Sequence, residues 1–143
     1  MKIHSRLTSI ATLLTLALST GAESVTSPDG RLIVTVDAEG GIPAYSVSYD
    51  GAEIIRRSPL GFKSNIGDFS SDMTLTGSKS GTVNKSFDQD KLKKSHIDYN
   101  ANTLATTFKN TKGGKMKVEW QVADNDIAFR YIIPAQGESR SMV

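Results

Sequence analysis

Residues 116–133 read MKVEWQVADNDIAFRYII, and apolar side chains alternate there with polar ones. In residues 116–122 every second side chain is apolar, and the side chains between them are Lys, Glu and Gln. Residues 124–126 (DND) predict a turn, and residues 127–133 then place a Phe and a Tyr in phase with the first Ile. This period of two predicts a pair of antiparallel strands with one face packed and the other in water.

The same period recurs between turn signals along the rest of the chain. A Pro-Asp-Gly turn at residues 28–30 precedes a predicted strand over residues 31–37, and a second strand is expected over residues 42–49. Asp50-Gly51 predicts a two-residue hairpin turn, because both central positions of such a turn favour positive φ. The returning strand is expected over residues 52–57.

The middle of the chain has weaker strand signals, rich in Thr and Ser. We expect a polar loop over residues 63–72, a charged loop or single helical turn over residues 88–94, and a hairpin turn at residues 112–115. Short extended segments are expected at residues 73–77, 81–87, 96–99 and 103–109. Many short strands separated by regular turns are typical of a sandwich or barrel. The sequence therefore predicts an all-β fold, an antiparallel β-sandwich.

The first residues have the anatomy of a secretory signal peptide. Lys2 and Arg6 precede an apolar run over residues 7–18, and small residues follow it up to Ala22. The alternatives are a membrane anchor and an amphipathic core helix, but the run is shorter than the ~20 residues that a spanning helix needs. We therefore expect a signal peptide over residues 1–22, cleavage near Ala22, a periplasmic or secreted location, and a β-sandwich domain over residues 23–143.

The charge balance argues against several classes of partner. The chain has 17 basic and 15 acidic residues and no cysteine. Loss of Lys2 and Arg6 with the leader leaves 15 of each, so the mature domain is formally neutral. A neutral domain lacks the overall basic character of proteins that bind nucleic acid or anionic membranes, so we expect neither partner after cleavage. Because an exported chain without cysteine has no disulfide, its core alone must stabilise the fold.

The mature sequence contains few candidates for catalysis. His96 is the single histidine after residue 22, and the chain has neither a cysteine nucleophile nor a G-x-S-x-G motif. A Ser-His-Asp site therefore has little support, and a structural or surface role is the simpler interpretation of His96. Acidic residues of the kind used in glycoside hydrolysis are present, but nothing marks a particular pair. We assign no catalytic residue.

Two pairs of acidic residues invite a metal-binding interpretation. They are Asp88 with Asp90, and Asp124 with Asp126. Calcium takes about six to eight oxygen ligands, and a pair of Asp side chains supplies only part of such a shell. Both pairs fall at predicted turns, where Asp is favoured because it hydrogen-bonds the local backbone. We therefore assign no metal ligand.

Trp120 is the single tryptophan and the candidate for stacking on a sugar ring. Its position is in phase with Val118 and Val122, which favours a place in the core instead. Aromatic residues make up only 7% of the chain, which is low for a module that stacks on sugars. Trp120 is the one candidate substrate-binding residue that the sequence offers.

Five stretches, in one order along the chain, resemble the N-terminal domain of glycoside hydrolase family 97. They are Ser27-Pro28-Asp29-Gly30 with the strand after it, Tyr45-Ser46-Val47-Ser48-Tyr49-Asp50-Gly51, Ser58-Pro59-Leu60-Gly61, the segment around His96 and Tyr99-Asn100, and Asp126-Ile127-Ala128-Phe129-Arg130-Tyr131. The second is similar to the family's Y-x-V-x-Y-x-G hairpin, the third to its S-x-L-G, and the last to its G-V-A-F-R-Y strand. The fourth is similar to its H-Y-N-E-L segment with altered spacing.

Family 97 comprises exported α-glucosidases and α-galactosidases of Bacteroidetes. The resemblance implies a large β-sandwich that packs on a catalytic (β/α)8 barrel and contributes to the substrate pocket. It also implies α-glycosides as substrates, and calcium as the cofactor of the parent enzyme but no cofactor in this chain. The family's catalytic carboxylates lie in the barrel. Because the chain ends at Val143, we expect an incomplete sandwich without the barrel, and without catalytic or calcium-binding residues.

Two other hypotheses stay open at this point. One is a stand-alone periplasmic carbohydrate-binding module, which predicts saturable binding of maltooligosaccharides or galactosides and its loss in Trp120→Ala. The other is an independent hydrolase, which predicts release of nitrophenol from aryl α-glycosides.

Overall fold

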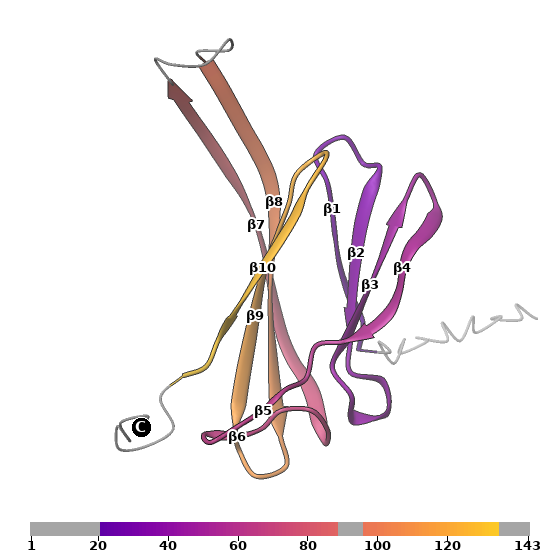
Figure 1. Cartoon of the computed structure of the whole chain (residues 1–143), viewed down its shortest axis with the longest axis vertical. Coiled ribbons are helices and arrows are strands. Elements are labelled where there is room, and N and C mark those ends of the chain that lie inside the picture. The colour runs from indigo at the N-terminus through magenta and orange to yellow at the C-terminus, as the bar shows by residue number, and fades with distance from the viewer. Residues whose placement is uncertain (1–20, 89–95, 135–143) are drawn as a thin grey trace, which may run out of the picture.

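The computed structural model describes residues 21–88 and 96–134, which form two antiparallel sheets packed face to face (Figure 1). The first sheet has the order β1-β2-β3-β4, from β1 (Glu23–Thr26), β2 (Leu32–Asp37), β3 (Ala44–Tyr49) and β4 (Ala52–Pro59). The second has the order β10-β9-β8-β7, from β7 (Met73–Asp88), β8 (His96–Asn110), β9 (Lys115–Val122) and β10 (Ile127–Ile132). The described residues contain a 3-10 turn, η1 (Glu39–Gly41), and no α-helix, which confirms the predicted all-β sandwich.

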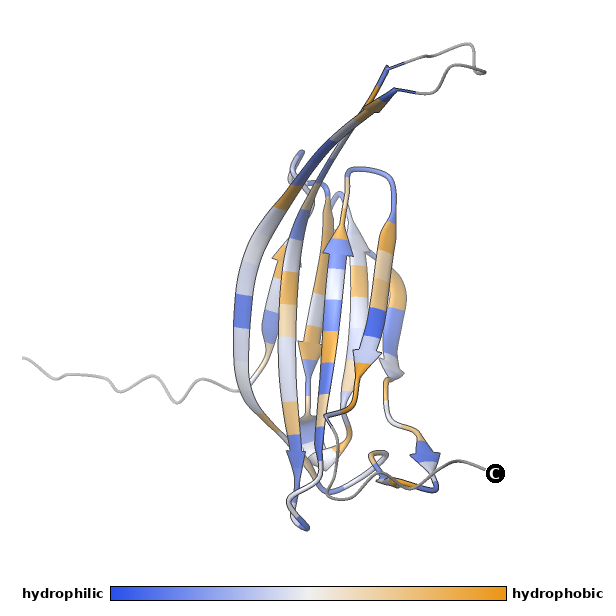
Figure 2. Ribbon diagram, turned by 90° about the vertical axis from the view of Figure 1, so that its left-hand side faces the viewer, coloured by the Kyte–Doolittle hydropathy of each residue, from blue (hydrophilic) through white to orange (hydrophobic). Residues whose placement is uncertain are grey.

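The core lies between the two sheets, and it follows the predicted alternation. Along β9 every second side chain faces the first sheet and is at most 1% exposed: Met116, Val118, Trp120 and Val122. Val34 and Val36 of β2, and Phe108 of β8, have no exposed surface. Figure 2 shows the resulting alternation of apolar and polar residues along the strands. Full burial of one such side chain contributes about 1.5–3 kcal/mol relative to leaving it exposed.

The turns also form largely where the sequence predicts them. Asp50 and Gly51 have φ angles of 49° and 80°, as the hairpin turn between β3 and β4 requires. Arg31 closes this end of the sheet, because its guanidinium lies 2.6 Å from the carboxylate of Asp50 and 4.6 Å from the ring centroid of Tyr49. Gly113, in the turn between β8 and β9, has a φ of 88°.

The four short segments predicted in the middle of the chain are all extended, but the prediction that they are separate is wrong. They merge into two strands of 16 and 15 residues, β7 and β8, which pair from Met73 with Asn110 to Asp88 with His96. The pairing of β7 with β8 continues past the end of β9. The last pair between β8 and β9 joins Asn102 to Val122. Residues 83–88 and 96–101 thus project beyond the sandwich, and we call this projection the arm (Figures 1 and 2). One face of the arm is exposed, while the other, with Ile97, Tyr99 and Ala101, is partly or fully buried, so polar and apolar residues still alternate over residues 96–101.

Two further expectations need correction, and several lie beyond the described residues. The segment over residues 63–72 is not only a polar loop, since it contains β5 (Lys63–Ser64) and β6 (Gly67–Asp68), followed by the buried ring of Phe69. β1 is a strand that the period did not predict. Residues 1–20 of the expected leader, residues 89–95 with Asp90, and the end at Val143 lie outside the described residues.

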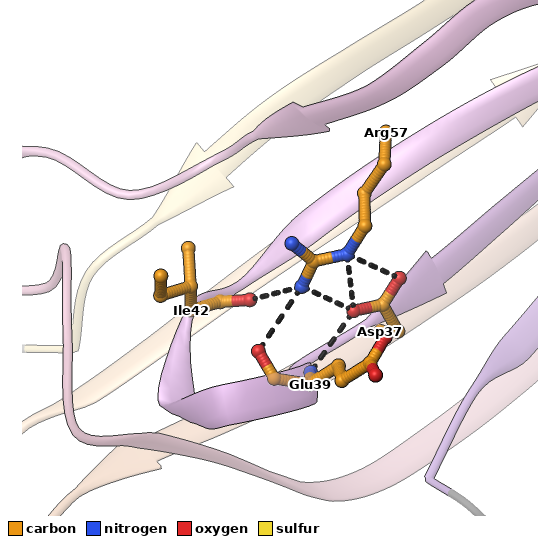
Figure 3. A network of polar contacts seen from close by, with 4 residues as sticks. All are labelled: Asp37, Glu39, Ile42 and Arg57. Atoms are coloured by element: carbon orange, nitrogen blue, oxygen red, sulfur yellow. Dashed lines mark hydrogen bonds and ion pairs between the residues drawn. The ribbon is translucent and has the colours of Figure 1, made fainter.

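An arginine network joins β4 to the connection between β2 and β3 (Figure 3). Arg57 donates hydrogen bonds to the carboxylate of Asp37 at 2.7 Å and to the carbonyl oxygens of Glu39 and Ile42 at 3.1 and 3.0 Å. Partial burial opposes ionisation of Asp37, but hydrogen bonds from Arg57 and from the Glu39 N–H outweigh it and hold the pKa of Asp37 below its ordinary value. The network fixes an edge strand that has little buried surface of its own.

Candidate functional site

One candidate surface is a cluster of aromatic side chains on the side of the sandwich where β4 and β10 form the sheet edges. We call it the aromatic edge, and its members are Tyr45, Phe62, Trp120, Phe129 and Tyr131. Their ring centroids lie between 4.7 Å (Trp120 to Phe129) and 5.9 Å (Tyr45 to Phe129) apart. Such distances are typical of packed aromatic pairs. The cluster ties the two sheets together, and the Tyr131 hydroxyl donates a hydrogen bond to the carbonyl of Leu60 at 2.8 Å.

The aromatic edge is only partly covered. Phe129 and Tyr131 are 42% and 40% exposed, and they lie on β10, the last strand of its sheet. Burial, and to a lesser extent Tyr45, raise the pKa of the Tyr131 hydroxyl. β4 adds Ile54 and Ile55, which are 58% and 38% exposed. Within the described residues, β4 and β10 have no strand on their outer side, and an apolar surface lies between these two edges. Such a surface is a usual setting for contact with another polypeptide.

Trp120 lies in the core and not on the surface. Its side chain is 1% exposed, and the rings of Tyr45 and Phe129 pack on it at 5.2 and 4.7 Å. Its indole Nε1 is buried without a hydrogen-bond partner among the described residues. A sugar could reach this ring only after one of the covering side chains moved. The in-phase position with Val118 and Val122, which favours the core, agrees with this placement.

Phe129 is an exposed aromatic residue that the sequence analysis did not identify as a surface group. It has the same inward phase as Trp120, and the two are directly paired across β9 and β10. Their burial differs because β9 is an interior strand and β10 an edge strand. Strand order is not visible in the sequence, so no local signal separates the two rings.

A second candidate surface is a groove of about 610 Å³ on the outer face of the second sheet, which we call the outer groove. Two rows of residues cross all four strands there, in the register of the ladder. The first row is Lys79, Ala105, Glu119 and Arg130, and the second is Gly81, Thr103, Gln121 and Ala128. The side chains of the second row are short or neutral, so the groove has room above it. Lys85 and Lys117 also line it.

The outer groove is positively charged. Glu119 is its one lining carboxylate, and it contacts Lys117 Nζ at 2.8 Å and Arg130 Nη2 at 2.7 Å. Hydrogen bonds from Lys117 first, and then from Arg130, hold the pKa of Glu119 below its ordinary value. Lys79 and Lys85 form no ion pair within the described residues. The mature domain is neutral as a whole, so these cations are a local concentration that composition did not indicate.

The remaining polar candidates of the sequence have local partners. The Nδ1 and Nε2 atoms of His96 lie 2.7 and 3.1 Å from carboxylate oxygens of Asp88 and Asp98, in the arm. Asp124 accepts a hydrogen bond from the N–H of Asp29 at 2.8 Å and so joins two turns, while Asp126 accepts one from the Tyr99 hydroxyl at 3.5 Å. Across residues 21–88 and 96–134, no three His, Asp or Glu side chains gather in a way that could hold a metal ion.

Comparison with known proteins places the chain among glycoside hydrolases. The family model "Glycosyl-hydrolase 97 N-terminal" matches residues 25–143. A protein of Streptomyces bingchenggensis (strain BCW-1), named "Probable retaining alpha-galactosidase", is 25% identical over 114 residues, which are 80% of this chain and 18% of that protein.

Solved structures agree with the sequence comparison. The chain is similar to a β-arabinopyranosidase, with a TM-score of 0.75 and 40% identity. It is also similar to a glycoside hydrolase family 97 enzyme of Pseudoalteromonas sp. strain K8, solved with panose and with acarbose, with a TM-score of 0.75 and 27% identity. Each match covers 80% of this chain and 18% of the relative. This chain therefore belongs to glycoside hydrolase family 97, as its N-terminal β-sandwich domain.

Proposed function

We propose that this chain is the non-catalytic N-terminal domain of an exported family 97 α-glycosidase, which packs on a catalytic domain and contributes to the substrate pocket. The observation that carries the proposal is the aromatic edge, where Phe129 and Tyr131 are 42% and 40% exposed beside strands that are sheet edges among the described residues. Because these rings are already partly buried, covering the remainder of each contributes about 1 kcal/mol to an interface.

The comparisons support this proposal through their coverage. The chain matches only 18% of the length of its relatives, so those proteins contain much polypeptide that this chain does not match. A catalytic barrel supplied by such polypeptide is the partner that we propose for the aromatic edge. The relatives solved with panose and acarbose favour α-glycosides as the carbohydrate class.

Calcium, which the family resemblance implies for the parent enzyme, has no visible site in this part of the chain. A calcium site needs about six to eight oxygen ligands. The described residues bring together no group of three acidic or histidine side chains for a metal ion. We propose that its ligands belong to parts of the parent enzyme that this chain does not match.

The proposal includes export to the periplasm or the medium. β1 begins at Glu23, so cleavage after Ala22 would leave every strand of the sandwich intact. Among the described residues, no helix is long and apolar enough to cross a membrane. Identification of the N-terminal residue of the secreted chain tests this point, with Glu23 as the expected result.

A domain replacement tests the packing role. This chain would replace the matching part of the 40% identical β-arabinopyranosidase, and turnover of an aryl arabinopyranoside would be measured. We expect the chimera to turn over this substrate. In the double variant Phe129→Lys, Tyr131→Lys, turnover should fall roughly tenfold or more, because charges buried at the interface disrupt it. Phe87→Lys is the matched control, since Phe87 in the arm is also 42% exposed.

Two results would contradict the proposed role. In the chimera, equal turnover of the double variant and of Phe87→Lys would show that the aromatic edge contacts nothing that matters for activity. Release of nitrophenol from aryl α-glycosides by the purified chain alone would show that the domain is catalytic.

The stand-alone carbohydrate-binding module is kept as a second candidate, because the outer groove offers a concave polar surface that the packing role does not use. Saturable binding of a neutral maltooligosaccharide by the purified chain would favour it. Loss of that binding in Ala128→Trp, which fills the groove, would assign the site.

A further inference from the structure

We propose that the outer groove is a binding site for an anionic saccharide, an oligosaccharide that carries carboxylate or sulfate groups. This inference goes beyond the packing role, because the aromatic edge and the outer groove use opposite faces of the second sheet. The register of β7, β8, β9 and β10 brings Lys79 and Arg130 into one row, at its two ends. With strands ~4.8 Å apart, these ends are about 14 Å apart, so a ligand lying across the sheet would meet a cation at each end.

The charges of the groove favour an anion. Four cationic side chains and one carboxylate line it. Glu119 is shared by Lys117 and Arg130, and Arg130 uses its Nε and one terminal nitrogen for it, which leaves other guanidinium donors for a ligand. Lys79 and Lys85 have no ion pair within the described residues, so a bound anion would not compete with a carboxylate for them.

The groove also has space at its centre. Gly81 and Ala128 stand at the two ends of the second row, and Ala105 lies inside the first. These residues have no long side chain to fill the volume of about 610 Å³, which is within the range of ligand sites. A Cβ atom added at Gly81 would lie 3.0 Å from the Thr103 hydroxyl, so the floor is closely packed even though the space above it is open.

The polar groups between the cations favour a saccharide over a nucleic acid. Thr103 and Gln121 are adjacent on the floor and provide a hydroxyl and an amide, which can both donate to and accept from sugar hydroxyls. Proteins that bind single-stranded nucleic acid combine cations with exposed aromatic platforms. The aromatic residues that contact the groove, Trp120 and Phe129, have inward-facing side chains. Membership of a carbohydrate-active family points to the same ligand class.

Calorimetric titration of the purified full chain tests the proposal. The probes are an oligogalacturonate, a sulfated galactan oligosaccharide, a neutral maltooligosaccharide and oligo-dT. We expect saturable binding of at least one anionic saccharide, weakened at high salt, and little binding of the neutral sugar or of oligo-dT. The two anionic probes distinguish the carboxylate from the sulfate as the ligand group.

Variants on the same sheet face locate the site. Lys79→Glu and Ala128→Trp alter exposed residues and are expected to weaken binding about tenfold or more, the first by reversing a charge and the second by filling the groove. Lys109→Glu is the matched control, an exposed lysine of β8 that does not line the groove. The unfolding transition of each variant confirms that it is folded.

Three results would overturn the proposal. They are binding of neither anionic saccharide, an equal loss of binding in Lys109→Glu and Lys79→Glu, and binding of oligo-dT as tight as that of the saccharides. None of them affects the packing role, because the chimera experiment changes only the aromatic edge and the arm.

Discussion

The body of the β7–β8 ladder and the arm are built from the same two strands but are stabilised differently. In the body, β8 places Leu104 and Phe108 in the core, at most 1% exposed, against the first sheet. In the arm, Ala101 is the one buried residue among residues 83–88 and 96–101. The arm relies on backbone pairing and on a polar cluster of Ser86, Asp88, His96 and Asp98. A continuous ladder can thus join a region stabilised by apolar burial to one that has almost none.

The largest expected effect contrasts a phenylalanine of the body with one of the arm. Phe108→Ala removes a ring with no exposed surface and is expected to lower the free energy of unfolding by about 3–5 kcal/mol. Phe87→Ala removes a ring that is 42% exposed and is expected to cost less than about 1 kcal/mol. Urea unfolding of both variants measures the difference. Equal losses would mean that the arm is as strongly packed as the body.

An intermediate effect is expected at the arginine network of Figure 3. Arg57→Ala should lower the free energy of unfolding by about 1 kcal/mol at neutral pH, because it removes charge-assisted hydrogen bonds to a partly exposed carboxylate. Arg56→Ala is the control, an exposed neighbour on β4 without an ion pair in the described residues.

The same network predicts a dependence on pH. The pKa of Asp37 is lowered in the folded state, so its contribution is present above the unfolded value of about 3.9 and is lost as the pH falls through the folded value. The difference between wild type and Arg57→Ala should therefore shrink below about pH 4. A difference that stays constant down to the acid transition would mean that ionisation of Asp37 contributes nothing.

The smallest expected effect concerns the polar cluster of the arm. His96→Ala removes contacts of 2.7 and 3.1 Å to two exposed carboxylates. Hydrogen exchange of the arm amides should quicken about twofold to fivefold, while the global free energy of unfolding changes by less than about 0.5 kcal/mol. Asn84→Ala, elsewhere in the arm, is the control. Faster exchange in the body as well would show that the two regions open together.

The sequence predicted the sandwich well where one face of a strand is buried. The alternation over residues 116–122 and the turn at Asp50-Gly51 are both confirmed, because side-chain direction and positive φ are local properties. It failed to predict β7 as one strand, because residues 76–82 in its middle (TGSKSGT) have no apolar side chain to mark a period. It also missed the outer groove, whose members come from four strands that are distant in the sequence.

The sequence by itself determined the class of fold, the family resemblance and the phase of strands such as β2 and β9, because these depend on residue types at short spacing. Only the tertiary structure decided which in-phase rings are covered. Trp120 and Phe129 are directly paired and face the same way, yet one is 1% and the other 42% exposed. Coverage depends on the strands of the facing sheet and on position within the sheet, and both are set by long-range pairing.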